Sequence, residues 1–167
     1  QLEDEYWKKI KMKEVEDFCK AKESAFIYAS NFSVGVNLFF KLNEVLAKLM
    51  SSHKRYQITM KEIHHIHKLD APSGTAITLA EGIVDQSDYT QWTLDKATKE
   101  NMLPIEVERT GEVPGNHAIK YESSVDSITI EHEAHSRNGF ALGAVIAAEW
   151  IQNKKGVFSM NDVLSLI

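Results

Sequence analysis

Residues 62–76 read EIHHIHKLDAPSGTA, a stretch that places three histidines, a lysine and an aspartate in its first nine residues. The stretch joins a predicted strand, Gln57–Ile66, to a predicted helix, Ser73–Gln86, whose apolar residues recur with helical spacing. Between the two, a proline fixes the backbone, Ser73 can cap the helix, and Gly74 lets a ligand approach the main chain. The sequence therefore predicts a strand, a turn and a capped helix around a polar site.

Outside this stretch, the spacing of apolar residues predicts further helices and strands. Helical periodicity is typical of Glu3–Lys22, Val34–Met50 and Phe140–Ile151, and strands are predicted at Ser24–Ala29, Pro104–Arg109, Ala118–Ser124 and Ser127–His132. Residues 87–100 are polar, and we expect them to form a surface excursion. The predicted fold class is α+β, with a mixed sheet of about four strands and helices packed on it.

The run Ser24–Ala29 (SAFIYA) differs from the other predicted strands because it is short and continuously apolar. Such a run is typical of a strand buried on both faces of a parallel sheet. Together with the helix before it, it predicts the last helix–strand unit of a doubly wound domain. We expect the partner strands to precede residue 1, and because the chain begins with Gln1, we expect a processed or truncated polypeptide.

Composition limits the classes of function. With 167 residues, 43% apolar and 26% charged, the chain can form one compact domain or slightly more. Its net charge of −5 disfavours nucleic-acid binding. The single Cys19 cannot form an internal disulfide, which suits a reducing cytoplasm. We also expect no membrane association, because we find no signal peptide and no apolar run long enough to span a bilayer.

Three interpretations compete for the histidine cluster, and the first is a metal site. A zinc site needs three or four converging ligands, whereas strand alternation places His64 and Lys68 on one face and only His65 and His67 on the other. The charge of a lysine next to the candidate ligands also repels a cation. His132 and His135 could add ligands, but we expect no metal. The second interpretation is a polar strand end with solvated histidines, which leaves unexplained why Lys68 is followed at once by a turn into a helix.

The third interpretation is the acid–base and anion-binding site of an enzyme. The first N–H groups of the helix after Ser73 point outward with the positive end of its dipole, and Thr75 adds a hydroxyl donor, so a carboxylate or phosphate can bind there. His64 and Lys68 supply an imidazole and an ammonium nearby, as proton transfer beside a bound carboxylate requires. An ordinary capped helix without a ligand is the alternative for this turn.

Residues His64–Ala76 (HHIHKLDAPSGTA) resemble the signature segment of the dihydrodipicolinate reductase family. Three further segments resemble the family in the same order: Ser30–Asn37 (SNFSVGVN), Arg109–His117 (RTGEVPGNH) and His132–Gly143 (HEAHSRNGFALG). The resemblance extends from about Ala25 to the C-terminus. It implies an oxidoreductase that transfers hydride from NADH or NADPH to a cyclic dicarboxylate imine in lysine and diaminopimelate biosynthesis.

The resemblance also implies roles for individual residues. It implies two catalytic residues, His64 as proton donor or acceptor and Lys68 as proton donor. It implies that the small dicarboxylate substrate is held by His65, Gly74 and Thr75. It implies that the nicotinamide end of the cofactor contacts the backbone of Ala29, Ser30, Asn31 and Phe32. For His65 to face the substrate as well, the strand must end near His64, where its alternation breaks.

One departure from the family is large, because the phosphate-binding G-x-G-x-x-G turn of its cofactor domain is absent from the sequence. The resemblance therefore implies that residues 1–33 are the remnant of a dinucleotide-binding (Rossmann) domain and that residues 34–153 form the substrate-binding and oligomerisation domain. Residues 154–167 would be a C-terminal tail that packs back toward the nucleotide domain. It further implies a cytoplasmic homotetramer joined through the sheets, and we expect this chain by itself to be inactive.

The alternative is a non-catalytic module, for oligomerisation or for binding a small dicarboxylate, that has lost its cofactor domain. Retention of the five residues with implied catalytic or substrate-binding roles favours descent from a working enzyme.

Overall fold

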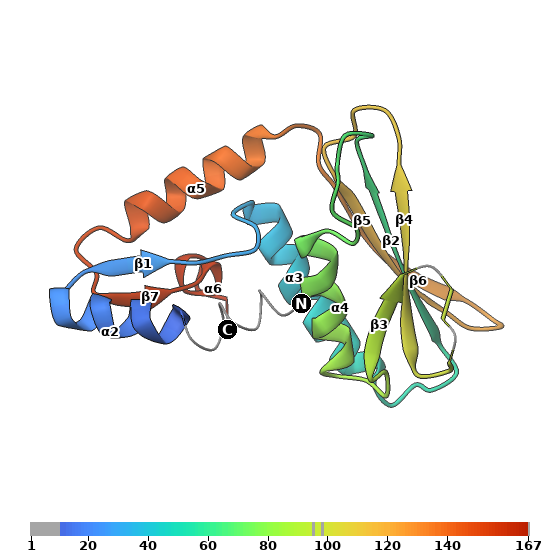
Figure 1. Ribbon diagram of the computed structural model, residues 1–167. Helices are drawn as coiled ribbons and strands as arrows, with labels where there is room; N and C mark the ends of the chain where they lie inside the picture. Colours follow the sequence, from blue (N-terminus) through green and yellow to red (C-terminus); the bar gives the residue numbers. More distant parts are fainter. Residues whose placement is uncertain (1–10, 95, 98, 167) are drawn as a thin grey trace.

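Figure 1 shows the protein as a computed structural model, in which residues 11–94, 96–97 and 99–166 are described. The helices are α2 (Met12–Lys22), α3 (Val34–Met50), α4 (Gly74–Val84), α5 (Asn138–Trp150) and α6 (Met160–Leu164). The strands are β1 (Ala25–Ile27), β2 (Gln57–His64), β3 (Gln91–Leu94), β4 (Met102–Arg109), β5 (Asn116–Glu122), β6 (Ser127–Glu133) and β7 (Gly156–Phe158). No helix in these ranges is both long and apolar enough to cross a bilayer.

The larger sheet has five strands in the order β3-β4-β2-β5-β6, and it confirms the predicted α+β class. The central strand, β2, runs parallel to β4 and antiparallel to β5. The fifth strand, β3, lies within residues 87–100, where the sequence predicts only a surface excursion. The prediction of a surface excursion without a strand is wrong. The strand could not be recognised because β3 is a four-residue edge strand with exposed or half-buried side chains and no alternating apolar pattern.

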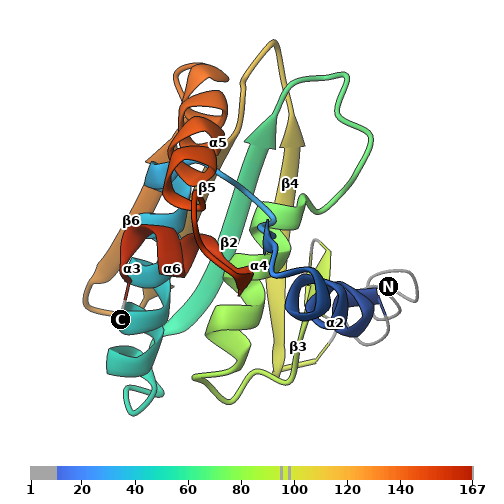
Figure 2. The same ribbon diagram turned by 90° about the vertical axis from the view of Figure 1, so that its left-hand side faces the viewer.

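The hydrophobic core lies between this sheet and the helices α3 and α4, which cover one of its faces (Figures 1 and 2). Each helix begins at a serine cap: the Ser33 hydroxyl accepts the Val36 N–H at 3.4 Å, and the Ser73 hydroxyl accepts the Ala76 N–H at 3.1 Å. The largest fully enclosed apolar side chains of this core are Leu79, Ile83, Leu103, Ile105, Ile119 and Tyr121. Packing of α4 on this core fixes where its first turn lies relative to the strand ends.

The predicted strand Ser24–Ala29 has a partner within the chain, which corrects the expectation that its partners are missing. Its ordered core, β1, pairs in parallel with β7, with Ala25 opposite Gly156 and Ile27 opposite Phe158. A pairing between three-residue strands so far apart in the sequence leaves no local pattern from which to predict it. The described part of the first predicted helix is α2, and residues 1–10 lie outside the described residues. The assignment of these segments to a nucleotide-binding domain stays a prediction.

The segment between β1 and α3 is held by α5 at one glycine. A Cβ atom built on Gly143 would lie 1.8 Å from the carbonyl oxygen of Phe32, so the two backbones touch and only glycine fits. Gly139, one turn earlier in the same helix, has ordinary room, since its nearest atom is the Ser33 hydroxyl oxygen at 3.7 Å. The position of the segment before α3 therefore depends on the absence of a side chain at Gly143.

We predict that Gly143→Ala lowers the free energy of unfolding by about 3 kcal/mol, because α5 must move away from Phe32. The matched control is Gly139→Ala, which should leave stability unchanged or raise it by up to about 1 kcal/mol, the helix propensity that alanine adds. Urea unfolding followed by circular dichroism measures both. Equal stabilities of the two variants would contradict the close contact.

Candidate active site

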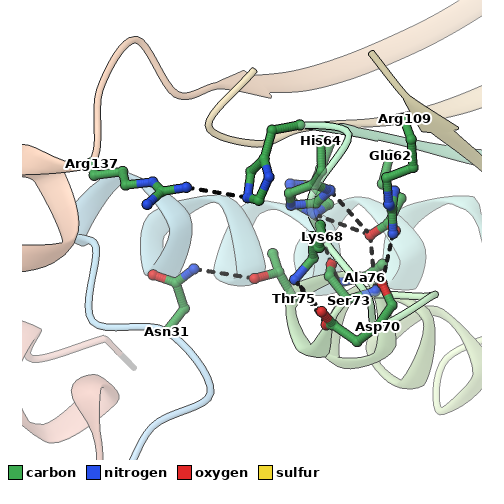
Figure 3. Close-up of polar contacts among 12 residues, drawn as sticks. Asn31, Glu62, His64, Lys68, Asp70, Ser73, Thr75, Ala76, Arg109 and Arg137 are labelled. Atoms are coloured by element: carbon green, nitrogen blue, oxygen red, sulfur yellow. Dashed lines mark hydrogen bonds and ion pairs between the residues drawn. The ribbon is translucent and has the colours of Figure 1, made fainter. Parts of the chain in front are cut away.

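The predicted site residues meet at one end of the five-stranded sheet (Figure 3). β2 ends at His64, which confirms that the strand alternation breaks there. β4 ends beside it at Arg109, in register with His64. After a turn that contains a cis peptide bond between Ala71 and Pro72, the chain enters α4. The carboxyl ends of two parallel strands and the positive end of a helix thus share one edge.

At the centre of this edge lies Glu62, a fully buried carboxylate with no exposed surface. Its Oε1 accepts from Nη2 of Arg109 at 2.9 Å, and its Oε2 accepts the backbone N–H of Ser73 at 3.0 Å. The same Arg109 nitrogen donates to the backbone carbonyl of Asp70 at 2.7 Å. Because these partners come from β4 and from the turn before α4, the carboxylate ties the turn to the strand ends.

The contacts of Glu62 keep it ionised. Burial by itself raises the pKa of this carboxyl group, but the contacts with His117, Ser73 and Arg109 outweigh it and lower the pKa to about 2 from an ordinary value near 4.5. A charge without access to water is tolerated only when it is paired and hydrogen-bonded. Glu62 is therefore a permanent negative charge under the site at any physiological pH.

His64 is buried beside this charge, with 6% of its surface exposed. Its Nδ1 lies 3.8 Å from Oε2 of Glu62, and its ring packs edge-on against His117, with 5.1 Å between the centroids. Burial is the main reason that the pKa of His64 falls to about 4, with Glu62 opposing that effect. A Cβ atom on Gly115 would lie 2.9 Å from Nε2 of His64, so the glycine makes room for the ring. His64 is therefore neutral near pH 7.

The ligand atoms of Glu62, His64 and His117 lie within 4.8 Å of one another, a grouping that a metal ion could use. Both Glu62 oxygens, however, already accept hydrogen bonds, from Arg109 and from Ser73. The guanidinium supplies the positive charge that a metal would otherwise supply, and it repels a second cation. The arrangement is therefore that of an internally neutralised carboxylate, and the absence of a metal stays a prediction.

Lys68 and Asp70 form an ion pair at the surface of the site. Nζ of Lys68 lies 2.7 and 2.8 Å from the two carboxylate oxygens of Asp70. The lysine side chain is 20% exposed and the aspartate 59%, so the pair faces solvent. Burial by itself raises the pKa of Asp70, but the hydrogen bond and charge of Lys68, together with a backbone hydrogen bond, lower it below its ordinary value. The ammonium is thus held next to the turn that leads into α4, where an incoming anion can reach it.

The first turn of α4 opens beside this ion pair. Gly74 is exposed, and a Cβ atom there would meet no heavy atom within 4 Å. Thr75 is only 7% exposed, so its hydroxyl lies beneath the opening. The Ala76 N–H bonds to the Ser73 cap, whereas a helix start leaves the N–H groups of Gly74 and Thr75 without an acceptor in the helix. The predicted anion cradle is therefore an open helix start.

His65 leaves the strand and approaches α5 from the other side of the opening. Its Nε2 lies 3.2 Å from Nη2 of Arg137, the residue before α5. Since arginine only donates, Nε2 accepts, and the ring proton of the neutral imidazole lies on Nδ1. Arg137 points toward the site from one side in Figure 3. A second fixed positive charge therefore stands at the rim, at a position for which the sequence implied no role.

The four predicted cofactor-contacting residues divide into two pairs. Ala29 and Phe32 pack on the small core of α5 and α6. The side chains of Ser30 and Asn31 instead reach α4: Ser30 Oγ lies 3.1 Å from the Thr78 hydroxyl, and the Asn31 amide nitrogen lies 3.1 Å from the Thr75 hydroxyl. The structure thus brings this segment together with Thr75, and it leaves the cofactor contact itself untested.

Most of the chain is similar to known proteins. Residues 35–164 match the sequence family described as "Dihydrodipicolinate reductase, C-terminus". The chain belongs to the dihydrodipicolinate reductase family.

Two curated relatives are named 4-hydroxy-tetrahydrodipicolinate reductase. The protein from Christiangramia forsetii is 55% identical over 150 residues, which are 89% of this chain and 62% of the relative. That from Methanococcoides burtonii is 40% identical over 142 residues, which are 83% of this chain and 53% of the relative. The chain therefore spans less than two thirds of the length of these reductases.

A solved structure shows the same fold at lower sequence identity. It is titled "Dipicolinate bound Dihydrodipicolinate reductase from Paenisporosarcina sp. TG-14" and superposes with a TM-score of 0.67 at 22% identity. The match covers 88% of this chain and 57% of that protein.

The sequence did not identify every residue that forms the site of this dihydrodipicolinate reductase family member. Glu62 was missed, although alternation along β2 places it on the same face as His64 and that signal was available. The ion-pair partner Asp70 and the rim residue Arg137 were missed as well, because their contacts depend on a turn and on a helix from elsewhere in the chain. Arg109 was matched only as part of a motif.

Because the folded pKa of Glu62 is depressed, its contribution to stability is present above pH 4.5 and lost as pH falls toward 2. The loss amounts to about 3 kcal/mol. We predict that Glu62→Gln lowers the free energy of unfolding at pH 7 by about 3–5 kcal/mol, since it leaves Arg109 without its partner. It should also flatten the pH dependence of stability between pH 4.5 and 2. Urea unfolding midpoints measured across this pH range test both effects.

The matched control is Glu108→Gln, at an exposed carboxylate of the neighbouring strand that pairs with Lys61. It should change stability at pH 7 by less than about 1 kcal/mol. The folded pKa of His64 is depressed to about 4, so its protonation lowers the free energy of unfolding as pH falls from 6.5 toward 4. That loss should remain in both variants. Equal effects of the two glutamine substitutions would contradict the central role of Glu62.

Proposed function

We propose that this chain is the substrate-binding and assembly part of a 4-hydroxy-tetrahydrodipicolinate reductase. The reaction would be the NADH- or NADPH-dependent reduction of a cyclic dicarboxylate imine in the cytoplasm, for lysine and diaminopimelate biosynthesis. The observation that carries the proposal is the open start of α4 at Gly74, beside the Lys68 ammonium and backed by the buried Glu62–Arg109 pair. The 55% identity to a reductase of that name supports it.

One substrate carboxylate would bind at the start of α4. The N–H groups of Gly74 and Thr75 and the Thr75 hydroxyl donate to it, and the helix dipole adds a favourable field. Lys68 lies beside this opening, and His65 with Arg137 stands at its rim. The solved relative is described as dipicolinate-bound, and dipicolinate carries two carboxylates, either of which can bind a helix start.

The proton chemistry would divide between two residues. Lys68 is charged and partly exposed, so it can donate a proton to the substrate when negative charge builds up on the ring. His64 is neutral, because burial lowers its pKa to about 4, and the nearby Glu62 favours the tautomer with the proton on Nδ1. Its Nε2 is then a proton acceptor. Burial of His64 keeps this imidazole from exchanging protons freely with water.

The chain's residues fit the nicotinamide end of a dinucleotide. The segment Ala29–Phe32 follows the carboxyl end of β1, the end at which open α/β sheets bind ligands, and the side chains of Ser30 and Asn31 touch α4. When bound, the cofactor supplies the hydride. The residues that would hold its nicotinamide end are Ala29, Ser30, Asn31 and Phe32, whereas no sequence for the pyrophosphate cradle occurs in this chain.

We predict that this chain binds pyridine-2,6-dicarboxylate with a dissociation constant of about 1 mM, since charge-assisted hydrogen bonds are partly offset by solvent screening. Amide resonances of Gly74 and Thr75 should shift during an NMR titration. Lys68→Ala and Thr75→Val should each weaken binding by about tenfold. A purely structural module would not bind the dicarboxylate at the helix start, and these resonances would then stay unmoved.

Lys61→Ala is the control for Lys68→Ala, because Lys61 lies on β2, upstream of the turn that contains Lys68, and its exposed side chain pairs with Glu108. It should leave the dissociation constant unchanged. A titration in which Lys61→Ala and Lys68→Ala weaken binding equally would contradict a specific site at the helix start and indicate non-specific anion binding.

The surface of the structure supports a homotetramer. One face of the five-stranded sheet is covered by α3 and α4, and none of the described helices covers the other face (Figure 1). In addition, α3 carries a stripe of exposed apolar residues along one side: Leu38, Leu42, Val45 and Leu49. A tetramer with two kinds of two-fold interface would bury both of these surfaces.

We predict that the wild-type chain is a tetramer at micromolar concentration, measured by light scattering. Leu42→Glu should reduce the mass to a smaller species, because it places a charge in the middle of the apolar stripe. Lys48→Glu, an exposed position of α3 outside the stripe, should not change the mass. A monomeric wild-type mass would contradict the proposed assembly.

A further inference from the structure

Asn31 forms a direct link between the segment before α3 and the first turn of α4. Its side-chain nitrogen lies 3.1 Å from Oγ1 of Thr75, and both residues are labelled in Figure 3. The side chain is held from its other end as well, because its Oδ1 accepts the backbone N–H of Ser33 at 2.8 Å. Its backbone carbonyl accepts from the Asn37 amide at 2.9 Å. Asn31 is therefore fixed in place before any ligand arrives.

These contacts determine which group donates to Thr75. Since Oδ1 of Asn31 is the acceptor for the Ser33 N–H, the amide nitrogen faces Thr75 and must be the donor. Oγ1 of Thr75 is then the acceptor, and its own hydrogen is left for another partner. Within the part of the chain that the structure describes, no acceptor for that hydrogen is found. The Thr75 hydroxyl is thus a fixed donor at a site open to an anion.

A second bond of the same polarity lies one turn further along α4. The Thr78 hydroxyl donates to the carbonyl of Gly74 at 3.0 Å, so in its 3.1 Å contact with Ser30 the serine hydroxyl is the donor. Both side chains of the segment therefore donate to threonines of α4. The two bonds differ in consequence. The hydroxyl hydrogen of Thr78 is already bonded to a carbonyl of the helix, whereas that of Thr75 is left for another partner.

We propose that Asn31 is a positioning residue that sets ligand specificity: it commits the Thr75 hydroxyl to donate to the substrate, so that the site selects an ionised carboxylate over a carboxamide. This inference rests on the proposed function, in which Thr75 binds a substrate carboxylate. It also makes the affinity for the carboxylate depend on the position of segment 29–32.

A double-mutant cycle tests whether Asn31 acts through Thr75. Binding of pyridine-2,6-dicarboxylate to this chain is measured by NMR for wild type, Asn31→Ala, Thr75→Val and the double variant. We expect Asn31→Ala to weaken binding about fivefold in the wild-type background and to have no effect once Thr75 is valine. The same fivefold loss in both backgrounds would show that Asn31 acts independently of Thr75, and would overturn the proposal.

A second variant, Asn31→Asp, keeps the acceptor for the Ser33 N–H but turns the donor toward Thr75 into an acceptor. The Thr75 hydroxyl must then donate to the aspartate and present its lone pair to the ligand. We expect this variant to bind 6-carbamoylpyridine-2-carboxylate more tightly than pyridine-2,6-dicarboxylate, the reverse of the wild-type order. Unchanged ligand preference would contradict the proposal, even if both affinities fell.

Ser30→Asp controls for the added charge, since it places a carboxylate on the neighbouring residue that faces Thr78. It should weaken dicarboxylate binding in a salt-dependent way and keep the wild-type preference. If Ser30→Asp reversed the preference as well, charge alone would explain the result, and the proposal would be wrong. If wild-type protein shows no binding at Gly74 and Thr75, the proposed function itself fails, which is a separate outcome from unchanged preference.

Discussion

The buried carboxylate of Glu62 is the constraint on which the site depends. With no exposed surface, this charge is tolerated only because Arg109 and the Ser73 N–H each donate a hydrogen bond to one of its two oxygens. Those partners come from a neighbouring strand and from the turn before α4, so neutralising one charge fixes three pieces of backbone relative to one another. The helix start faces outward beside Lys68 because its turn is anchored from within. The carboxylate that shapes the site is thus hidden from the ligand that the site would bind.

The segment before α3 is the second constraint, and it is held from two sides. On one side, Gly143 brings α5 into backbone contact with Phe32. On the other side, Ser30 and Asn31 reach the first two turns of α4. The residues that would touch the cofactor and the helix that would bind the carboxylate therefore share hydrogen bonds. Under the proposed function, a displacement of this segment would change the donors that the substrate meets, and cofactor binding and substrate binding would then be coupled through it.

Local patterns in the sequence predicted those elements that local patterns determine. The bounds of α3 were predicted exactly as observed, because a serine cap and a long apolar stripe define them. The small sheet was not predicted, since β1 and β7 are three residues each and pair across most of the chain. In the site, His64 and Lys68 stood out as a polar cluster, and Gly74 stood out at the start of the helix that follows. Glu62 did not stand out, because its role as a buried, paired carboxylate depends on Arg109, which lies 47 residues further on.

The central claim is that a helix start anchored by a buried charge binds a substrate carboxylate. It is tested most directly by a crystal structure of this chain grown with pyridine-2,6-dicarboxylate. The account predicts one carboxylate within hydrogen-bond distance of the Gly74 and Thr75 N–H groups and of the Thr75 hydroxyl, with Lys68 turned from Asp70 toward the ligand. A ligand bound elsewhere on the surface, with the Lys68–Asp70 pair intact and the start of α4 vacant, would contradict it.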